Sequence, residues 1–230
     1  MKRAALLSTL ALLCGLALGF VVGNGVMPSI PFSASASARS ETNYVYASYH
    51  PTPVQTEVPL DPDDNTPLLE RAGLVLEALK AEDYAALAQL VHPEQGVTLT
   101  PYSTVDPACD NAMSQEQVRH LAQDEHIYTW GLFDGSGIPI RCTPAQYFQR
   151  YVFNADFTTA PQVGIDTVLI SGNALENVAE AYPEGRFVEY HFPGIDPELK
   201  GFDWCSLKLI FEVWNNEWYL VGIVHGEWTI

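Results

Sequence analysis

The chain has 230 residues, of which 47% are hydrophobic and 11% aromatic, and its formal net charge is −17 at pH 7. A surface this acidic repels nucleic acid and anionic lipid head groups, so proteins that bind polyanions are excluded as a class. The aromatic and aliphatic content is enough to bury the core of one domain.

The N-terminus has the three parts of a secretory signal. Lys2 and Arg3 precede an apolar run over residues 4–23, and Ala36-Ser37-Ala38 ends a small-residue segment. Residues 1–38 are therefore predicted to be a signal peptide. The apolar run, at about 20 residues, is also long enough to remain as a membrane anchor. Both alternatives place the protein outside the cytoplasm, secreted or anchored at the outer face of the cell membrane, with membrane contact through this segment alone.

Residues 39–65 have no hydrophobic period and are rich in Pro, Thr, Ser and Asp, as in residues 51–53 and 61–64. This composition is typical of a flexible linker. A single domain is predicted over residues 66–230.

Helices are predicted first in this domain. Thr66 can cap a helix with Pro67 at its first position. The apolar stripe of this helix comprises Leu68, Ala72, Val75, Leu76 and Leu79. A second helix is predicted from Asp83 and ends before Pro93.

Two later segments carry capping boxes, in which a hydroxyl stands three residues before a Gln. They lie at residues 114–117 and 143–146. Each predicts the first turn of a further helix.

Strands are predicted around and after these helices from β-rich runs bounded by turn residues. The runs cover residues 97–100, 127–133, 186–192, 204–214 and 217–228. Asp134-Gly135-Ser136-Gly137 is expected to be a plain turn. Residues 154–185 have no clear period, and residues 173–181 are left open as a short helix or a loop.

Asn215-Asn216 predicts a two-residue hairpin turn, because Asn tolerates the positive φ that such a turn needs. With this turn, Phe211 faces Leu220 on an apolar, buried face of the hairpin. The reverse face is mixed, with Ser206 opposite His225 and Glu212 opposite Tyr219.

Three cysteines follow the predicted leader. Export permits disulfides, and Cys109 and Cys142 are the predicted pair because both lie beside turn residues. Cys205 lies within a strand pattern and is expected to be buried.

The order of helices followed by a long antiparallel sheet resembles the cystatin-like α+β fold, which includes the nuclear-transport-factor-like domains. Several segments also look like those of an uncharacterised family of exported bacillal and clostridial proteins. These are VHPEQGV (91–97), YTWG (128–131), DGSG (134–137), VEYHFPG (188–194) and WYLVGI (218–223). The resemblance implies N-terminal helices packed on a curved antiparallel sheet, and it brings no catalytic residue.

The mixed face of the C-terminal sheet holds the candidate site. Glu189, His191 and His225 are the candidate catalytic residues, because a carboxylate can hold an imidazole in the tautomer needed for general base catalysis. Trp204, Ser206, Lys208 and Tyr219 are the candidate ligand-binding residues. The alternative is an ordinary solvated sheet face. No ligand spacing predicts a metal site, and no motif predicts a cofactor.

Two functions follow from this pattern. The first is a non-enzymatic extracytoplasmic domain that binds a small apolar ligand or a protein partner, or serves as an accessory domain. The second is a small cofactor-free enzyme of isomerase or hydrolase type that uses the Glu/His cluster. The fold does not decide between them.

Overall fold

The computed structural model describes residues 59–61 and 63–229. The predicted signal or anchor and most of the predicted linker lie outside these residues. Within the described range, no helix is both long and apolar enough to cross a membrane. The first described helix, α1, covers Thr66–Lys80, with Asn65 rather than Thr66 at its N-cap and a proline in its first turn.

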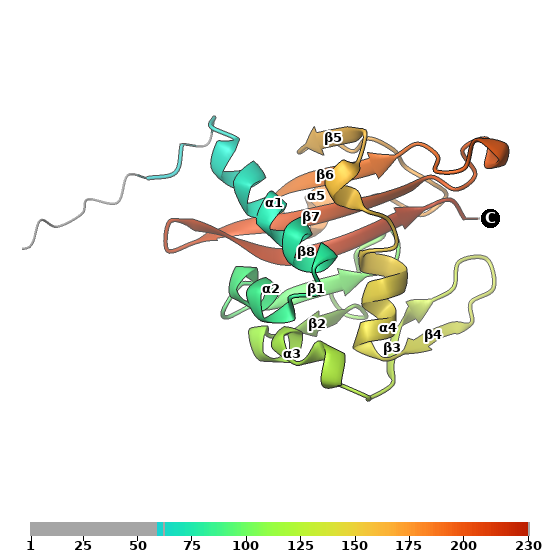
Figure 1. The fold of residues 1–230 in the computed structure, drawn as a ribbon, viewed down its shortest axis with the longest axis horizontal. Helices are drawn as coiled ribbons and strands as arrows, with labels where there is room; N and C mark the ends of the chain where they lie inside the picture. Colours follow the sequence, from blue (N-terminus) through green and yellow to red (C-terminus); the bar gives the residue numbers. More distant parts are fainter. Residues whose placement is uncertain (1–58, 62, 230) are drawn as a thin grey trace, which may run out of the picture. The chain divides into compact units, whose positions relative to one another are not determined.

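The centre of the domain is a six-stranded sheet in the order β2-β1-β8-β7-β6-β5 (Figure 1). Neighbouring strands are antiparallel, except that β1 runs parallel to β8. The sheet is therefore mixed, whereas the sequence predicted an antiparallel one. Its strands are β1 (Val97–Thr100), β2 (Asn111–Met113), β5 (Gln162–Ile165), β6 (Arg186–Phe192), β7 (Cys205–Trp214) and β8 (Glu217–Glu227).

A separate two-stranded sheet is formed by β3 (Tyr128–Leu132) and β4 (Pro139–Cys142). The predicted turn at residues 134–137 joins the two strands. The sequence predicted β3 but missed β4. The four residues of β4 begin with a proline and include few apolar side chains, so they show no strand pattern.

Helices cover one face of the large sheet, which we call the inner face (Figure 1). They are α1, α2 (Tyr84–Leu90), α3 (Gln115–Arg119) and α4 (Pro144–Tyr147), which continues as a π-helical turn over Phe148–Val152. Both predicted capping boxes are formed, at Ser114 and at Thr143. Short 3₁₀ turns occupy Leu121–Gln123, Phe157–Thr159 and Pro197–Leu199.

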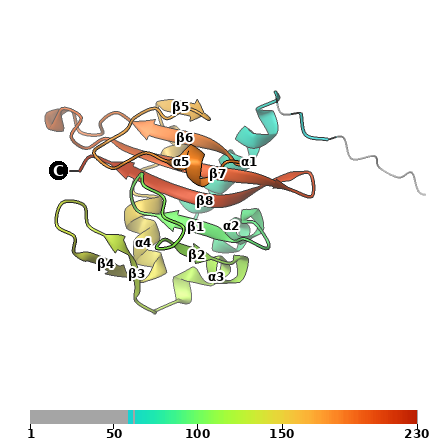
Figure 2. The same cartoon turned by 180° about the vertical axis from the view of Figure 1, so that it is seen from behind.

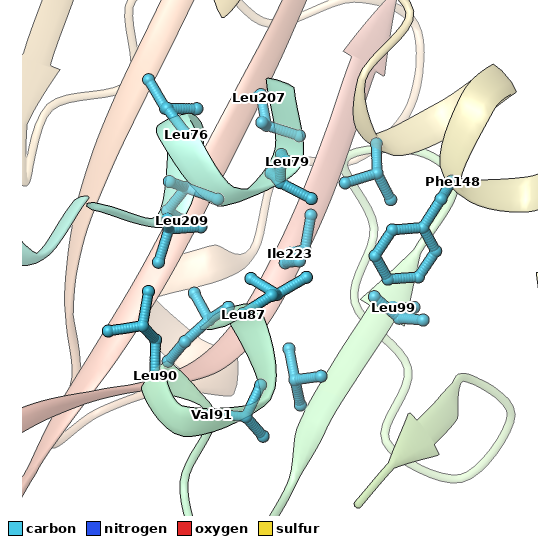
Figure 3. Close-up of a cluster of buried hydrophobic side chains, with 14 of the residues drawn as sticks. Leu76, Leu79, Leu87, Leu90, Val91, Leu99, Phe148, Leu207, Leu209 and Ile223 are labelled. Carbon is cyan, nitrogen blue, oxygen red and sulfur yellow. The ribbon is translucent and has the colours of Figure 1, made fainter. Parts of the chain in front are cut away.

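The main core lies between these helices and the inner face (Figure 3). Leu76 and Leu79 of α1 and Leu87 of α2 pack on Leu209 and Ile223 of the sheet. The apolar stripe predicted for α1 is buried along its whole length. Transfer of these side chains out of water is the main force that holds α1 and α2 on the sheet.

The opposite, outer face is covered by a mostly irregular stretch, residues 166–177, and by α5 (Val178–Ala181) (Figure 2). We call residues 166–177 the cover segment. A second, smaller apolar cluster lies beneath this cover, and it comprises Val105, Val178, Phe187, Ile210, Val221 and Val224. The alternative of a solvated outer face is therefore wrong, because both faces of the sheet are sealed. The α+β class predicted from the sequence, with N-terminal helices on a sheet, is confirmed.

The hairpin of β7 and β8 turns at Asn215 and Asn216, whose φ angles are +48° and +62°. The predicted register holds from this turn to the pair Phe211 and Leu220. The register then shifts by one residue, between the Ile210 and Phe211 pairs.

This bulge changes the face on which every later β8 residue lies, because side chains alternate along a strand. Ser206 consequently pairs with Gly226, and His225 pairs with Leu207 on the inner face. The predicted pairing of Ser206 with His225 is wrong.

Candidate functional site

The outer face carries a square of four polar side chains on adjacent strands. Glu189 of β6 lies opposite Lys208 of β7, and His191 lies opposite Ser206. Each of the four is 3% exposed or less. The strand pairing thus brings together four of the seven candidate residues that the sequence placed on the mixed face.

Charge holds this square to the cover segment. The Lys208 ammonium lies 2.8 Å from Oε2 of Glu176 and 3.5 Å from Oε1 of Glu189. Glu189 also accepts a hydrogen bond of 2.8 Å through Oε2 from the backbone N–H of Leu169. A buried lysine requires such partners, because an unpaired charge out of water is very costly. The contacts of Glu176 and Leu169 fasten the cover segment onto the sheet.

His191 and Ser206 form the other edge of the square. Burial lowers the pKa of His191, against an opposing effect of Glu189, and so disfavours protonation of the imidazole. The ring of Trp204 lies 6.0 Å from the imidazole. A Cβ atom on Gly226 would come within 2.6 Å of Ser206 Oγ, so the glycine makes room for this hydroxyl. Neither His191 Nδ1 nor Ser206 Oγ has a hydrogen-bond partner among the described residues.

His225 lies across the sheet from this square, on the inner face. Its Nε2 is 3.3 Å from Oε2 of Glu227, and Arg150 donates two hydrogen bonds of 3.0 and 2.8 Å to the same carboxylate. Burial lowers the pKa of His225 more than Glu227 raises it. Burial raises the pKa of Glu227, but His225 and Arg150 outweigh it and lower that pKa to about 2. Glu227 therefore lies as a carboxylate beside an imidazole whose protonation is disfavoured by burial.

Aromatic rings fill the space next to His225. Tyr151 meets the imidazole edge-on at 5.8 Å, Tyr147 lies 5.1 Å from Tyr151, and Trp130 stacks on Tyr147 at 4.1 Å. Trp130, Tyr147 and Tyr151 are each 2% exposed or less. This end of the inner face is thus packed with side chains.

The proposed catalytic cluster of Glu189, His191 and His225 is therefore not assembled. The sheet separates His225 from the other two residues, and all three are buried. The ligand-binding candidates also divide into two groups. Trp204, Ser206 and Lys208 lie under the outer cover, whereas Tyr219 lies near the hairpin turn, 5.8 Å from Trp214.

The predicted disulfide is not formed. Cys109 and Cys142 are both free thiols, as is the buried Cys205. Cys109 is exposed in a turn where its pKa is raised by a hydrogen bond to Asp106. Cys142 ends β4 opposite Tyr128 and packs against the main core. The turn context used to pair them does not bring their side chains together.

An open groove with a volume of about 600 Å³ lies between residues 101–110 and residues 131–137. Its apolar lining includes Leu132 and Phe133, which are 56% and 42% exposed. Gly131 has a φ of +140°, and a Cβ there would lie 3.1 Å from the Pro101 side chain. The glycine thus permits the hairpin to approach the loop closely. Ala174 of the cover segment also lines the groove.

Sequence reasoning missed this groove, because its walls are far apart in the chain. One signal was present: Leu132 and Phe133 stand immediately before a turn, where apolar side chains have little to pack on. A second hollow, of about 290 Å³, lies beside Lys80 and Glu82 and is lined by more polar groups. Among the described residues, no three His, Cys, Asp or Glu side chains are grouped closely enough to hold a metal ion.

Comparison with known proteins supplies no activity. No protein-family model matches the chain, and no curated protein matches it. Among solved structures, an NTF-2 like protein of unknown function from Shewanella oneidensis is 10% identical, with a TM-score of 0.33, over 71% of this chain and 98% of that one. The protein Aln2 from a Streptomyces species is 6% identical, with a TM-score of 0.33, over 74% of this chain and 94% of that one.

At such identities and TM-scores these likenesses carry no argument about the fold, activity or partners of this chain. They do not bear on the resemblance to exported bacillal and clostridial proteins, which stays a prediction.

Proposed function

We propose that this chain is a non-enzymatic binding domain that works outside the cytoplasm and holds a small apolar ligand in the groove. The extracytoplasmic location is supported by the basic start, apolar run and Ala-x-Ala ending of residues 1–38. The net charge of −17 keeps the domain away from nucleic acid and anionic membranes. Contact with a membrane is confined to the N-terminal segment.

One contrast carries the proposal: the groove is open and exposes apolar side chains, whereas the glutamate and histidines predicted to be catalytic are buried. General acid–base catalysis needs a group within hydrogen-bond reach of a substrate. Glu189, His191 and His225 are each 3% exposed or less and are divided between the two faces of the sheet. An isomerase or hydrolase that uses these three residues together is not supported by this placement.

The size of the groove favours a small ligand over a protein partner. Small-molecule sites have volumes of roughly 300–1,000 Å³ and a mostly apolar lining, and the groove, at about 600 Å³, falls within this range. Exposed Leu132 and Phe133 supply apolar surface that a ligand would remove from water.

The proposal is tested with the neutral fluorescent probe N-phenyl-1-naphthylamine on the full chain. Phe133→Ser is expected to weaken binding about tenfold, because burial of an aromatic side chain is worth about 1.5–3 kcal/mol. Phe202→Ser is the matched control, since Phe202 is also exposed, at 61%, and does not line the groove. Equal binding by the wild type and Phe133→Ser would contradict the proposal.

A further inference from the structure

The groove is acidic as well as apolar. Asp106 and Asp110 line one wall, and Asp134 lines the other. None of the described residues that line it is a lysine, arginine or histidine. Elsewhere in the described chain, carboxylates such as Glu227, Glu176 and Asp166 are paired with a cation. The groove is therefore a place where negative charge is gathered without a counter-charge.

Hydrogen bonds from neighbouring groups fix the carboxylates of Asp110 and Asp134. Asp110 accepts hydrogen bonds through Oδ2 from Thr100 and from the backbone of Asp106, at 2.7 and 2.8 Å. Asp134 accepts a bond of 3.0 Å through Oδ1 from the backbone of Gly135. Among the described residues, the second oxygens of Asp110 and Asp134 have no hydrogen-bond donor. A side chain that is already held in place loses little conformational entropy when a ligand donates a hydrogen bond to its remaining acceptor oxygen.

The electrostatic field inside the groove favours a bound cation. Burial raises the pKa of Asp110, and the neighbouring charge of Asp106 adds to this effect. A positive group bound between the walls would relieve both the repulsion and part of the desolvation. Phe133 and Tyr102 also line the groove, and aromatic rings attract cations through their faces.

The arrangement does not suit a metal ion. Across the described residues, no three carboxylate, imidazole or thiolate groups lie close enough together to coordinate one. The acids are instead divided between two walls, with Leu132 and Phe133 beside them. A ligand that satisfies both features carries its charge on one part and an apolar surface on another.

We propose that the groove binds an organic cation with an apolar body, such as a long-chain alkylamine. Its ammonium group lies toward Asp106, Asp110 and Asp134, and its chain packs on Leu132 and Phe133. This inference rests on the proposed function, since it names the class of ligand for the same groove.

The test uses three probes of equal length and different charge: octylammonium, 1-octanol and octanoate. Each is titrated into the full chain at low salt below its aggregation threshold. Binding is read from the NMR shifts of the Gly131 and Gly135 amides, which report on the groove and not on the N-terminal segment. Octylammonium is expected to bind at least about tenfold more tightly than 1-octanol, as expected for a charge-assisted contact, and octanoate more weakly than either.

Variants separate the two proposals. Asp134→Asn and Asp110→Asn should each reduce the preference for octylammonium over 1-octanol, and 0.5 M NaCl should reduce it in the wild type. Glu94→Gln removes an exposed charge that does not line the groove and is the matched control. Asp134→Asn is the more secure variant, because Asp110 also supports Thr100.

Equal affinity of octylammonium and 1-octanol, unchanged by Asp134→Asn, would overturn the cation inference while leaving an apolar binding groove. Failure of all three probes to shift the Gly131 and Gly135 amides would instead overturn the proposed function itself. The two failures are therefore distinguishable in one set of spectra.

Discussion

The two faces of the sheet are sealed in different ways. The inner face is covered by helices whose apolar stripes pack on Leu207, Leu209 and Ile223 (Figure 3). The outer face is covered by the cover segment (Figure 2). This segment is fastened by the ion pair of Glu176 with Lys208 and by the hydrogen bond from Leu169 to Glu189.

The difference shows what each kind of cover requires. An amphipathic helix supplies enough apolar area to hold itself on a sheet. An irregular segment supplies less, and its backbone groups must still find partners. Thr104 and Asn177 add such contacts at the end of the cover, where they bond to Leu175 and to Val105.

The largest predicted loss of stability follows from substitution of Lys208 on the outer face. Lys208→Met leaves Glu189 and Glu176 without their counter-charge, and removal of one member of a buried ion pair costs about 3–5 kcal/mol. Urea unfolding measures this loss. Lys208→Met combined with Glu189→Leu should recover most of it, because the remaining acid, Glu176, is partly exposed. A double variant no more stable than the single one would show that charge pairing does not hold this face together.

The inner face should respond to volume instead of charge. Leu209→Ala removes a fully buried side chain from the main core, and such truncations cost about 2–5 kcal/mol through lost burial and the cavity that remains. The same unfolding assay applies, with Leu74→Ala, an exposed leucine of α1, as the control. A loss below about 1 kcal/mol would mean that the helices are not held by this core.

A smaller loss of stability is expected from a substitution at Gly226, where β8 approaches Ser206. Gly226→Ala would place a Cβ 2.6 Å from Ser206 Oγ, and overpacking of this kind costs about 1–3 kcal/mol. Ser206→Gly in the same chain should restore most of the stability, since it removes the clashing atom. If Gly226→Ala is neutral, the register after the bulge is not as described.

The smallest predicted effect is a dependence of the free energy of unfolding on pH. Burial lowers the pKa of both His191 and His225 from 6.5, so below about pH 6.5 the unfolded chain binds protons more readily than the folded one. The free energy of unfolding should therefore fall as the pH drops from 7 to 5. A second loss is expected between pH 4.5 and 2 as Glu227 is protonated.

Unfolding measured at pH 7.0 and 5.5 tests the first of these losses. His225→Gln and His191→Gln should each reduce the difference between the two values. An undiminished difference in both variants would contradict the assignment of the slope to these imidazoles.

Much of this fold could be predicted from local pattern. The stripe of α1, the capping boxes at Ser114 and Thr143 and the turn at Asn215 are each encoded by a few adjacent residues. Features that depend on distant segments could not be predicted. The parallel pairing of β1 with β8 and the outer cover have no local signal.

The prediction of the candidate site was wrong at His225, because a β-bulge is not visible in the sequence pattern. Periodicity placed His225 beside Ser206, and one bulge moved it to the other face. The groove was missed because residues 101–110 and 131–137 meet only in the folded chain.

The central claim is that the groove is open to ligands while both faces of the sheet are sealed. Alkylation of the native thiols with N-ethylmaleimide, followed by peptide mass spectrometry, tests it most directly, because Cys109 lines the groove and Cys205 is buried in the sheet. Cys109 is predicted to react in the native state because it is exposed, although Asp106 raises its pKa and slows the reaction, and to be protected by octylammonium. Cys205 is buried, and burial raises its pKa to about 11, so it should react only on unfolding. Reaction of Cys205 at the rate of Cys109, or no protection of Cys109 by the ligand, would contradict the account.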